Sequence, residues 1–422
     1  MRVKLPYGKE KLICDLPDER VNSVLVSDVE SYEIKRSEED LVREALANPI
    51  ASESLAELVQ GKDSIVIISS DHTRPVPSHI TMPILLEELR KGNSDIDITI
   101  LVATGFHRAS TDAELRDKYG DEIVDNEKIV IHDCRDDEMM LKLGTLPSGG
   151  ELILNKLAIE TDVLIAEGFI EPHFFAGFSG GRKSVLPGIA SKDTVLANHC
   201  SEFIADDKSR TGILKGNPLH RDMIYAAEKA ELKFILNVVL DGDKKIIKAV
   251  AGDSDKAHQA GCEFVDRLAG VDKHAADIVI STNGGYPLDQ NIYQAVKGMT
   301  AAEAVCNKNG VIIMLAECSD GHGGEEFYQT FAQADSVKDV MHDILRRKRN
   351  ETVPDQWESQ VLARVLLDFT VIMVTDVSRE IVEDMHMKYA ASLDEAIAMA
   401  EEIVGRDRKI TVIPDGVAVV VR

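Results

Sequence analysis

Short apolar segments alternate along this chain with segments of helical periodicity. The apolar segments have the length of buried strands, which we expect at residues 64–68, 96–102, 129–131, 162–166, 234–240, 277–281, 311–315 and 370–374. Between them, apolar residues recur at helical spacing, at residues 38–47, 84–90, 111–119, 194–198, 221–230, 258–268, 334–345 and 393–404. This alternation indicates βαβ units, so we predict an α/β fold with mainly parallel sheets.

The length of the chain favours two domains. Single hydrophobic cores stop growing at about 250–300 residues, and this chain has 422. Near Gly270 a predicted helix ends on glycine, and a polar spacer precedes the strand that begins at Asp277. We therefore expect two α/β domains, residues 1–270 and 271–422, with a cleft between them of the kind in which small molecules usually bind.

Charge and composition narrow the range of partners. The chain has 48 Lys and Arg residues against 73 Asp and Glu residues, a net charge of −25. A nucleic-acid partner is not expected, because neutralising phosphates requires a basic face. A membrane partner is not expected either, because no apolar run approaches the ~20 residues of a spanning helix. The six cysteines are scattered without a C-x-x-C pair, and the first residues lack the apolar run of a signal peptide, so we expect a cytoplasmic protein.

A glycine-rich stretch from Phe174 to Gly188 contains the pair Arg182–Lys183. Its glycines and backbone amides predict an anion cradle over residues 179–184, and we expect Ser184 to cap a following helix. A P-loop would have glycine before the Lys-Ser pair, whereas this chain has Arg182. We therefore predict a phosphate or carboxylate site outside the nucleotide triphosphatases. The alternative is a glycine-rich turn with a surface basic pair, which the apolar flanks disfavour.

Polar residues follow the ends of four predicted strands. They lie at residues 71–77, 104–108, 167–173 and 282–287. Ligands of open parallel sheets bind outside the carboxyl ends of the strands, so we expect these four loops to converge on one edge. His107 and His173 would then form an acid/base pair, because histidine titrates near neutral pH. Taken singly, each could equally be a hydrogen-bonded loop residue.

Three further groups of residues have both a functional and a structural interpretation. Asp71 and Arg74 lie in a loop that prolines stiffen, which suits positioning, although a plain surface ion pair is the alternative. Tyr293 and Lys297 share a helix face with a glutamine at position 294, and a solvated helix flank is the alternative. Trp357, the one tryptophan, is of a type found more often in a core than in a site.

Taken together, these motifs resemble the nickel-pincer lactate racemase family. The resemblance rests on five segments that occur in order, Asp71–Pro75, Gly105–Arg108, Glu171–Ser184, Asn198–His199 and Tyr293–Gly298, followed by Trp357. Each segment is moderately specific, and the ordered set is highly specific.

The resemblance implies a two-domain isomerase that racemises a small 2-hydroxy acid, lactate first and another 2-hydroxy acid as the alternative. It implies a cofactor made by maturation enzymes, the pyridinium-3,5-bisthiocarboxylic acid mononucleotide nickel pincer, covalently attached at Lys183. His199 would be the nickel ligand of the protein, and His107 and His173 the catalytic pair. The further residues implied for the cofactor are Asp71, Ser179, Gly180, Gly181, Arg182 and Ser184, and those for the substrate are Arg74, Tyr293, Gln294, Lys297 and Trp357. The N-terminal domain would carry cofactor and histidines, and the C-terminal domain would close over the substrate.

This chemistry suits the residue types. A hydrogen beside a carboxylate is a poor acid, so its removal as hydride to a bound pyridinium avoids a dianion. Racemisation then requires one base for each enantiomer. Arg182 beside Lys183 favours the neutral, nucleophilic amine. Two rival functions remain, a hydrolase with His107, His173 and His199 as a zinc triad, and a non-catalytic binding or metal-delivery protein.

Overall fold

The computed structural model describes residues 1–422, and the chain forms two compact units. The N-terminal unit consists of Val29–His199 and Lys208–Arg267, and the C-terminal unit of Leu268–Arg422 together with Met1–Asp28 and Cys200–Asp207. No helix is both long and apolar enough to cross a membrane.

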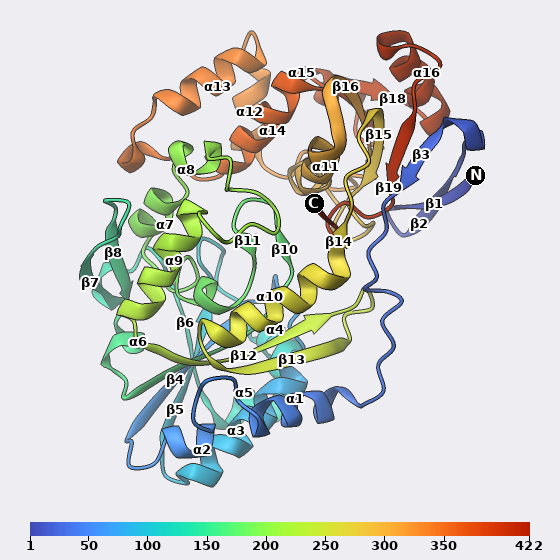
Figure 1. Ribbon diagram of the computed structural model, residues 1–422. Helices are drawn as coiled ribbons and strands as arrows, with labels where there is room; N and C mark the ends of the chain where they lie inside the picture. The colour runs from blue at the N-terminus through green and yellow to red at the C-terminus, as the bar shows by residue number, and fades with distance from the viewer. The chain divides into compact units, whose positions relative to one another are not determined.

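The N-terminal unit is built on a six-stranded sheet (Figure 1). The strand order is β13 (Ile246–Asp253), β12 (Leu232–Leu240), β9 (Val163–Phe169), β4 (Ser64–Ser70), β5 (Asp97–Ala103) and β6 (Lys128–Ile131). All neighbouring pairs are parallel except β12 and β13. Two hairpins accompany the sheet, β7 (Met140–Thr145) with β8 (Glu151–Asn155), and β10 (Pro172–His173) with β11 (Gly177–Phe178). The helices are α1 (Glu38–Ala47), α2 (Leu55–Leu58), α3 (Ser78–Gly92), α4 (Asp112–Tyr119), α5 (Asp121–Asn126), α6 (Lys156–Glu160), α7 (Lys192–Asn198), α9 (Pro218–Lys229) and α10 (Lys256–Ala269), the last extending two residues past the unit.

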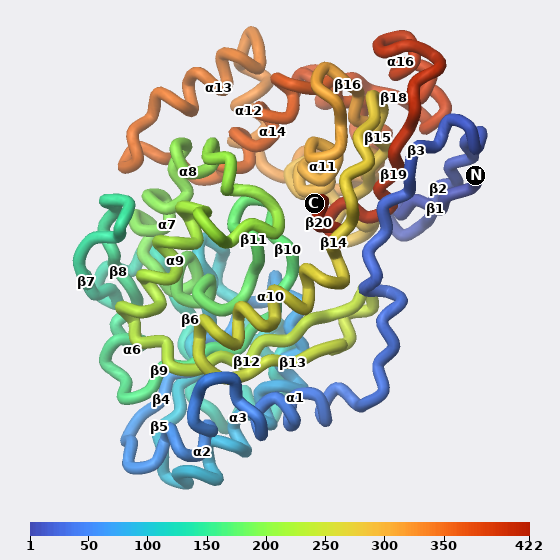
Figure 2. The backbone as a smooth tube through the Cα atoms, viewed as in Figure 1, coloured from blue at the N-terminus to red at the C-terminus, as the bar shows by residue number.

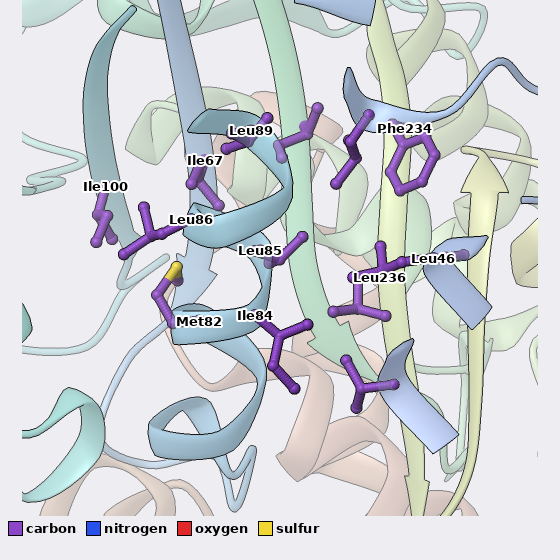
Figure 3. Close-up of a cluster of buried hydrophobic side chains, with 14 of the residues drawn as sticks. Leu46, Ile67, Met82, Ile84, Leu85, Leu86, Leu89, Ile100, Phe234 and Leu236 are labelled. Carbon is purple, nitrogen blue, oxygen red and sulfur yellow. The ribbon is translucent and has the colours of Figure 1, made fainter. Parts of the chain in front are cut away.

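Helix α3 shows why this sheet has a dry face. Its apolar residues Met82, Leu85, Leu86 and Leu89 follow the spacing of one helical stripe, and all four are buried. They pack in one cluster with strand residues such as Ile67 (Figure 3). The continuous apolar runs of β4 and β5 fit this position, because strands of a parallel sheet are covered on both faces.

The C-terminal unit contains a second six-stranded sheet, entirely parallel. Its order is β18 (Lys388–Ala390), β17 (Thr370–Val374), β16 (Cys306–Leu315), β15 (Ala276–Thr282), β19 (Ile410–Ile413) and β3 (Val21–Val24). Short strands β14 (Gly270–Val271) and β20 (Val420–Val421) pair beside it, and β1 (Arg2–Tyr7) forms a hairpin with β2 (Glu10–Asp15). The helices are α8 (Ser201–Ala205), α11 (Ile292–Val305), α12 (Glu325–Ala332), α13 (Val337–Arg346), α14 (Gln356–Asp368), α15 (Arg379–Asp384) and α16 (Leu393–Val404).

The predicted α/β class with mainly parallel sheets is confirmed, and each of the eight predicted strands is present. The expected division at residue 270 differs from the observed units in two respects, because residues 200–207 lie in the C-terminal unit and so does the N-terminal segment, which is blue in Figure 2. Residues 1–28 belong to the C-terminal unit, where β3 pairs with β19 and β1 contributes Leu5 to the core. A pairing between residues about 390 positions apart leaves no local pattern in the sequence.

The four strand-end loops do not share one sheet edge, so that expectation is wrong. Strands β9, β4 and β5 are neighbours in the N-terminal sheet, and the loops after them are brought together. The fourth loop, residues 283–287, follows β15 in the sheet of the C-terminal unit.

Candidate active site

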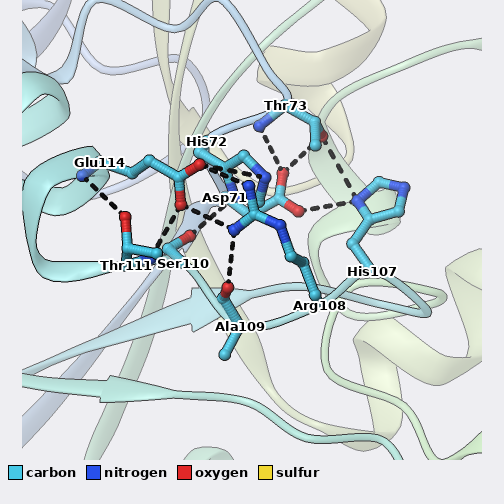
Figure 4. A network of polar contacts seen from close by, with 9 residues as sticks. All are labelled: Asp71, His72, Thr73, His107, Arg108, Ala109, Ser110, Thr111 and Glu114. Atoms are coloured by element: carbon cyan, nitrogen blue, oxygen red, sulfur yellow. Dashed lines mark hydrogen bonds and ion pairs between the residues drawn. The ribbon is translucent and has the colours of Figure 1, made fainter.

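The loops after β4 and β5 join a histidine to a buried carboxylate. His107 Nδ1 lies 2.7 Å from Asp71 Oδ2 (Figure 4). Thr73 donates to the other carboxylate oxygen through its hydroxyl at 2.6 Å and its amide at 3.1 Å. The side chain of Asp71 is 2% exposed and that of His107 is 44% exposed, so the carboxylate is held inside while the imidazole reaches out.

The electrostatics of this pair define the proton positions. Burial alone would raise the pKa of Asp71, but the hydrogen bonds from His107 and Thr73 and the charges of His107 and Arg74 lower it below its usual range. An ionised Asp71 accepts from Nδ1–H, so Nε2 of His107 carries the lone pair. This tautomer is the one that a general base needs.

The arginines of these loops have different surroundings. Arg74 is exposed and forms no ion pair with Asp71, so the surface-pair alternative for these two residues is wrong. Arg108 instead binds both carboxylate oxygens of Glu114, at 2.8 and 2.6 Å. Glu114 also closes the capping box of α4 with Thr111, which fixes the loop that carries His107 (Figure 4).

His173 lies in the hairpin of β10 and β11, which follows β9. Its ring stacks on Phe174 with 5.1 Å between centroids and meets the edge of Phe175 at 4.5 Å. The Ala176 amide donates to Nδ1 at 3.4 Å, and Nε2 lies 3.5 Å from Lys183 Nζ. The structure therefore brings this histidine together with the lysine of the glycine-rich stretch.

Lys183 belongs to a single 3₁₀ turn, Gly181–Ser184. Burial holds the pKa of its amine well below the usual range, and the positive charges of Arg182 and Arg74 lower it further. The expected influence of Arg182 on this amine is thus present, although burial is the larger cause. A neutral amine has a lone pair and can act as a nucleophile.

Arg182 holds the glycine-rich stretch in shape from inside. Its side chain is 1% exposed, and its guanidinium donates to the carbonyls of Ala176, Phe178 and Gly180 at 2.9, 2.9 and 3.1 Å. Arg182 also contacts the Ser179 carbonyl at 3.5 Å, and His220 Nδ1 and His258 Nε2, both at 3.0 Å. The expected contact of Arg182 with a phosphate therefore has no support in this geometry, since its donors bind the protein.

The backbone of this stretch is also largely satisfied internally. The amide of Ser179 donates to Glu171 O, that of Gly181 to Asn237 Oδ1 at 2.8 Å, and that of Lys183 to Gly180 O. Gly180 has φ 76°, and a Cβ there would lie 2.7 Å from Phe169 O. These glycines serve close packing. Contacts of Ser179, Gly180, Gly181 and Ser184 with a phosphate stay a prediction, and any cradle would have fewer amides than expected.

The expectation that Ser184 caps a helix is wrong. The next helix is α7, and its N-cap is Ser191, whose hydroxyl accepts from the Thr194 amide at 3.3 Å. Turn residues separate Ser184 from α7. The predicted metal ligand, His199, lies at the other end of this helix.

His199 is the C-cap of α7 and is 4% exposed. Its Nδ1 donates to the Val195 carbonyl at 2.9 Å, so Nε2 carries the lone pair. Burial is the main cause that lowers the pKa of His199 to about 3, and any positive charge on nearby Lys183 would act in the same direction. A neutral imidazole with Nδ1–H bound to a backbone carbonyl is the usual state of a metal-ligating histidine.

The substrate residues implied by the resemblance in the C-terminal unit form their own cluster. Tyr293 and its neighbours lie on α11, and Trp357 lies at the start of α14. Lys297 Nζ donates to Gln294 Oε1 at 2.6 Å, and a hydrogen bond joins the side chains of Tyr293 and Trp357. The structure places this cluster within its unit only, so its contact with a substrate stays a prediction.

Three acidic residues were missed or given another role. Asp71 binds His107, a role that the sequence did not indicate, and its contact with the cofactor stays a prediction. Asp355 accepts from Tyr293 Oη at 2.8 Å, and Glu358 is buried beside Lys297. Glu358 stands one residue from Trp357, yet no motif singled it out, because nothing local shows that a charged residue is buried.

Known proteins resemble the chain over its whole length. Residues 7–212 match the lactate racemase N-terminal domain, and residues 271–421 match the lactate racemase C-terminal domain. A lactate racemase of Thermoanaerobacterium thermosaccharolyticum is 60% identical over 421 residues, and one of Lactiplantibacillus plantarum is 56% identical over 421 residues; both comparisons cover 100% of this chain and 99% of the relative.

Solved structures show the same likeness. The lactate racemase apoprotein from T. thermosaccharolyticum superposes with a TM-score of 0.97, at 60% identity and with 100% of both chains covered. A protein from Thermotoga maritima, 20% identical, has a TM-score of 0.64 over 93% of this chain and shares the fold alone. The two matching domain descriptions and the full-length identity agree, and the chain therefore belongs to the lactate racemase family and is an isomerase of the racemase type.

Proposed function

We propose that this protein racemises lactate, with another 2-hydroxy acid as the alternative substrate. The observation that supports the substrate is the 60% and 56% full-length identity to two lactate racemases. The observations that support the chemistry are the Asp71–His107 pair and the contact of His173 with a buried lysine of lowered pKa, in loops that follow the neighbouring strands β4, β5 and β9.

The residues present fit the nickel-pincer nucleotide that the resemblance implies. Lys183 would carry the covalent attachment, because burial lowers the pKa of its amine and so favours the nucleophilic, uncharged form. His199 would supply a neutral imidazole nitrogen, and imidazole with soft sulfur donors suits Ni(II). When bound, the group supplies the acceptor that takes and returns the hydrogen of the substrate carbon with its electron pair. Maturation enzymes that make the group, and a cytoplasmic location, belong to the same proposal.

The two histidines would move the hydroxyl proton. His107 Nε2 takes this proton from one enantiomer, and the buried Asp71 carboxylate stabilises the imidazolium that results. His173 serves the other enantiomer. The substrate carbon becomes planar when it loses hydrogen with its electron pair, and it would regain this hydrogen on the opposite face. One histidine takes the proton of the hydroxyl group, and the other returns a proton to the same oxygen. Arg74 and Lys297 would hold the substrate carboxylate with Gln294, while Tyr293 and Trp357 would line the side-chain pocket.

The rival zinc hydrolase is less well supported. No three His, Cys, Asp or Glu side chains are arranged to hold a metal ion together, so His107, His173 and His199 form no triad. Nδ1 of His107 is also committed to Asp71, and that of His199 to Val195. A non-catalytic protein would leave the orientation of His107 by a buried carboxylate without a purpose.

Racemisation by the matured protein tests the proposal. Protein from a host that makes the cofactor is incubated with single enantiomers of lactate and of bulkier chiral 2-hydroxy acids. The appearance of the other enantiomer is measured by chiral chromatography. Fastest conversion of lactate supports the proposal. Racemisation of another 2-hydroxy acid but not of lactate supports the alternative substrate. Hydrolytic activity that zinc restores, without racemisation of any 2-hydroxy acid, supports the hydrolase.

Arg74→Ala is expected to weaken substrate use and leave cofactor loading intact. A charge-assisted hydrogen bond to a carboxylate contributes about 1.5–3 kcal/mol, so kcat/KM should fall about 10- to 150-fold. Arg43→Ala is a matched control, because Arg43 is exposed and pairs with Glu87 on the same unit. Unchanged kcat/KM in a fully loaded Arg74→Ala enzyme would remove Arg74 from the substrate site.

Asp71→Asn is expected to lower kcat while nickel content stays normal. The amide cannot stabilise the His107 imidazolium, and it can present its NH₂ to Nδ1 and impose the wrong tautomer. Loss of a hydrogen bond to a charged group should lower kcat about 10- to 100-fold. Steady-state kinetics and metal analysis on one preparation measure both quantities. A loss of cofactor with normal kcat per loaded site would instead support the direct cofactor contact first expected for Asp71.

A further inference from the structure

The first two turns of α14 carry an unusual set of buried polar side chains. Gln356, Glu358, Ser359 and Gln360 are each at most 3% exposed. Three of them have a buried polar atom without a hydrogen-bond partner, Gln356 Nε2, Glu358 Oε1 and Gln360 Oε1. Buried polar atoms without a partner are destabilising and rare in native proteins, so the start of this helix requires an explanation.

Glu358 is the ionisable member of this set, and it faces the polar cluster of α11. The charges that act on its carboxyl are those of Lys297 on α11 and Asp355 in the turn before α14. Glu358 in turn acts on Tyr293 of α11, whose hydroxyl donates to Asp355 at 2.8 Å. These are the groups beside which the substrate carboxylate is proposed to bind.

The protonation of Glu358 follows from this setting. Burial is the main cause that raises the pKa of the Glu358 carboxyl to about 8. The negative charge of Asp355 raises this pKa further, and the positive charge of Lys297 lowers it. Near neutral pH the carboxyl therefore carries a proton for most of the time. When the proton leaves, the positive charge of Lys297 on α11 stabilises the buried carboxylate.

We propose that Glu358 is a positioning residue that couples substrate binding to a proton, because its buried carboxyl and the substrate carboxylate compete for the Lys297 ammonium. This inference rests on the proposed function of Lys297. An ionised Glu358 pairs with Lys297 and leaves no net positive charge for the incoming anion. A protonated Glu358 carries no charge and leaves the Lys297 ammonium to the substrate carboxylate. Binding of the anion therefore takes up one proton from solvent whenever Glu358 starts ionised.

The test is the pH dependence of KM for the holoenzyme with L-lactate and with D-lactate. Wild-type KM is expected to rise above about pH 8, by up to about tenfold per pH unit, because one proton is linked to binding. Glu358→Gln mimics the protonated acid in shape and is expected to abolish this rise. Glu326→Gln, at an exposed position of α12, is the matched control and should keep the wild-type slope.

Calorimetry gives a readout that does not depend on turnover. Racemic lactate undergoes no net reaction, so titrating it into holoenzyme at pH 9 in buffers of different ionisation enthalpy measures the protons taken up. Wild type should take up more protons per lactate than Glu358→Gln. Equal uptake in both proteins, or a wild-type KM that stays flat from pH 7 to 9.5, would overturn the inference.

Stability supplies a second measurement if the variant binds lactate poorly for another reason. The pKa of Glu358 is raised on folding, so the native state holds the proton longer than the unfolded state. The contribution of Glu358 to stability is then present below about pH 4.5 and is lost as the pH rises towards 8. Urea unfolding of wild type and Glu358→Gln should diverge across that window. Parallel curves would show that the carboxyl is not protonated in the fold.

Failure to racemise any 2-hydroxy acid would contradict the proposed function, whereas racemisation with a flat KM profile contradicts only this inference.

Discussion

Lys183→Ala is expected to abolish both the covalent adduct and measurable racemisation while the fold stays intact. The reason is that one buried amine with a strongly lowered pKa lies beside His173, and it is the proposed attachment point. Removing a buried amine also removes a desolvation cost, so stability should not fall through lost charge. Intact mass of protein from a cofactor-producing host reads out the adduct.

Lys192→Ala is the matched control for this experiment. Lys192 is exposed at the first position of α7, in the same unit and close in sequence. It should retain the adduct and the activity. An active, adduct-free Lys183→Ala enzyme would disprove the attachment, and an adduct that persists in the variant would place it on another side chain.

The three histidines are expected to separate into two classes. His107→Ala and His173→Ala should each lower racemisation in both directions by about 10²–10⁴-fold, the usual contribution of a general acid or base, because the cycle needs one proton removed and one returned. Both should retain nickel. His199→Ala should lose nickel first, since its Nε2 is the proposed ligand.

Metal content and two-direction kinetics on the same purified variants decide between the classes. His79→Ala is the control, because His79 is exposed on α3. If His107→Ala or His173→Ala strips the nickel while His199→Ala keeps it, the assignment of bases and ligand is reversed. Joint loss of metal in all three would favour a histidine triad after all.

The strand-end loops show how far a local pattern reaches. The apolar runs at β4, β5 and β9 predicted three parallel strands, and parallel strands end at one edge. The sequence therefore predicted that the loops carrying His107 and His173 follow neighbouring strands, as they do. The partner of His107 was not predicted, because Asp71 precedes it by 36 residues and faces it only after β4 and β5 pair in register.

The glycine-rich stretch shows where the same reasoning fails. Glycines and a basic pair indicated an anion cradle, but Arg182 points inwards to three carbonyls and the Gly181 amide donates to Asn237. Tight packing against Asn237 and His258 requires glycine as strongly as a phosphate would. A sequence cannot distinguish close packing from phosphate binding, since both require a residue without a Cβ.

The sequence by itself determined the α/β class, the strands and the candidate residues, because hydrophobic periodicity and residue chemistry are local properties. The tertiary structure decided which charges are buried and what they face. Burial lowered the pKa of the Lys183 amine, and the contact with Asp71 oriented His107. It also decided that Glu358 lies in the core beside Lys297. These outcomes depend on desolvation and on contacts between residues far apart in the chain, and neither exists until the sheets have formed.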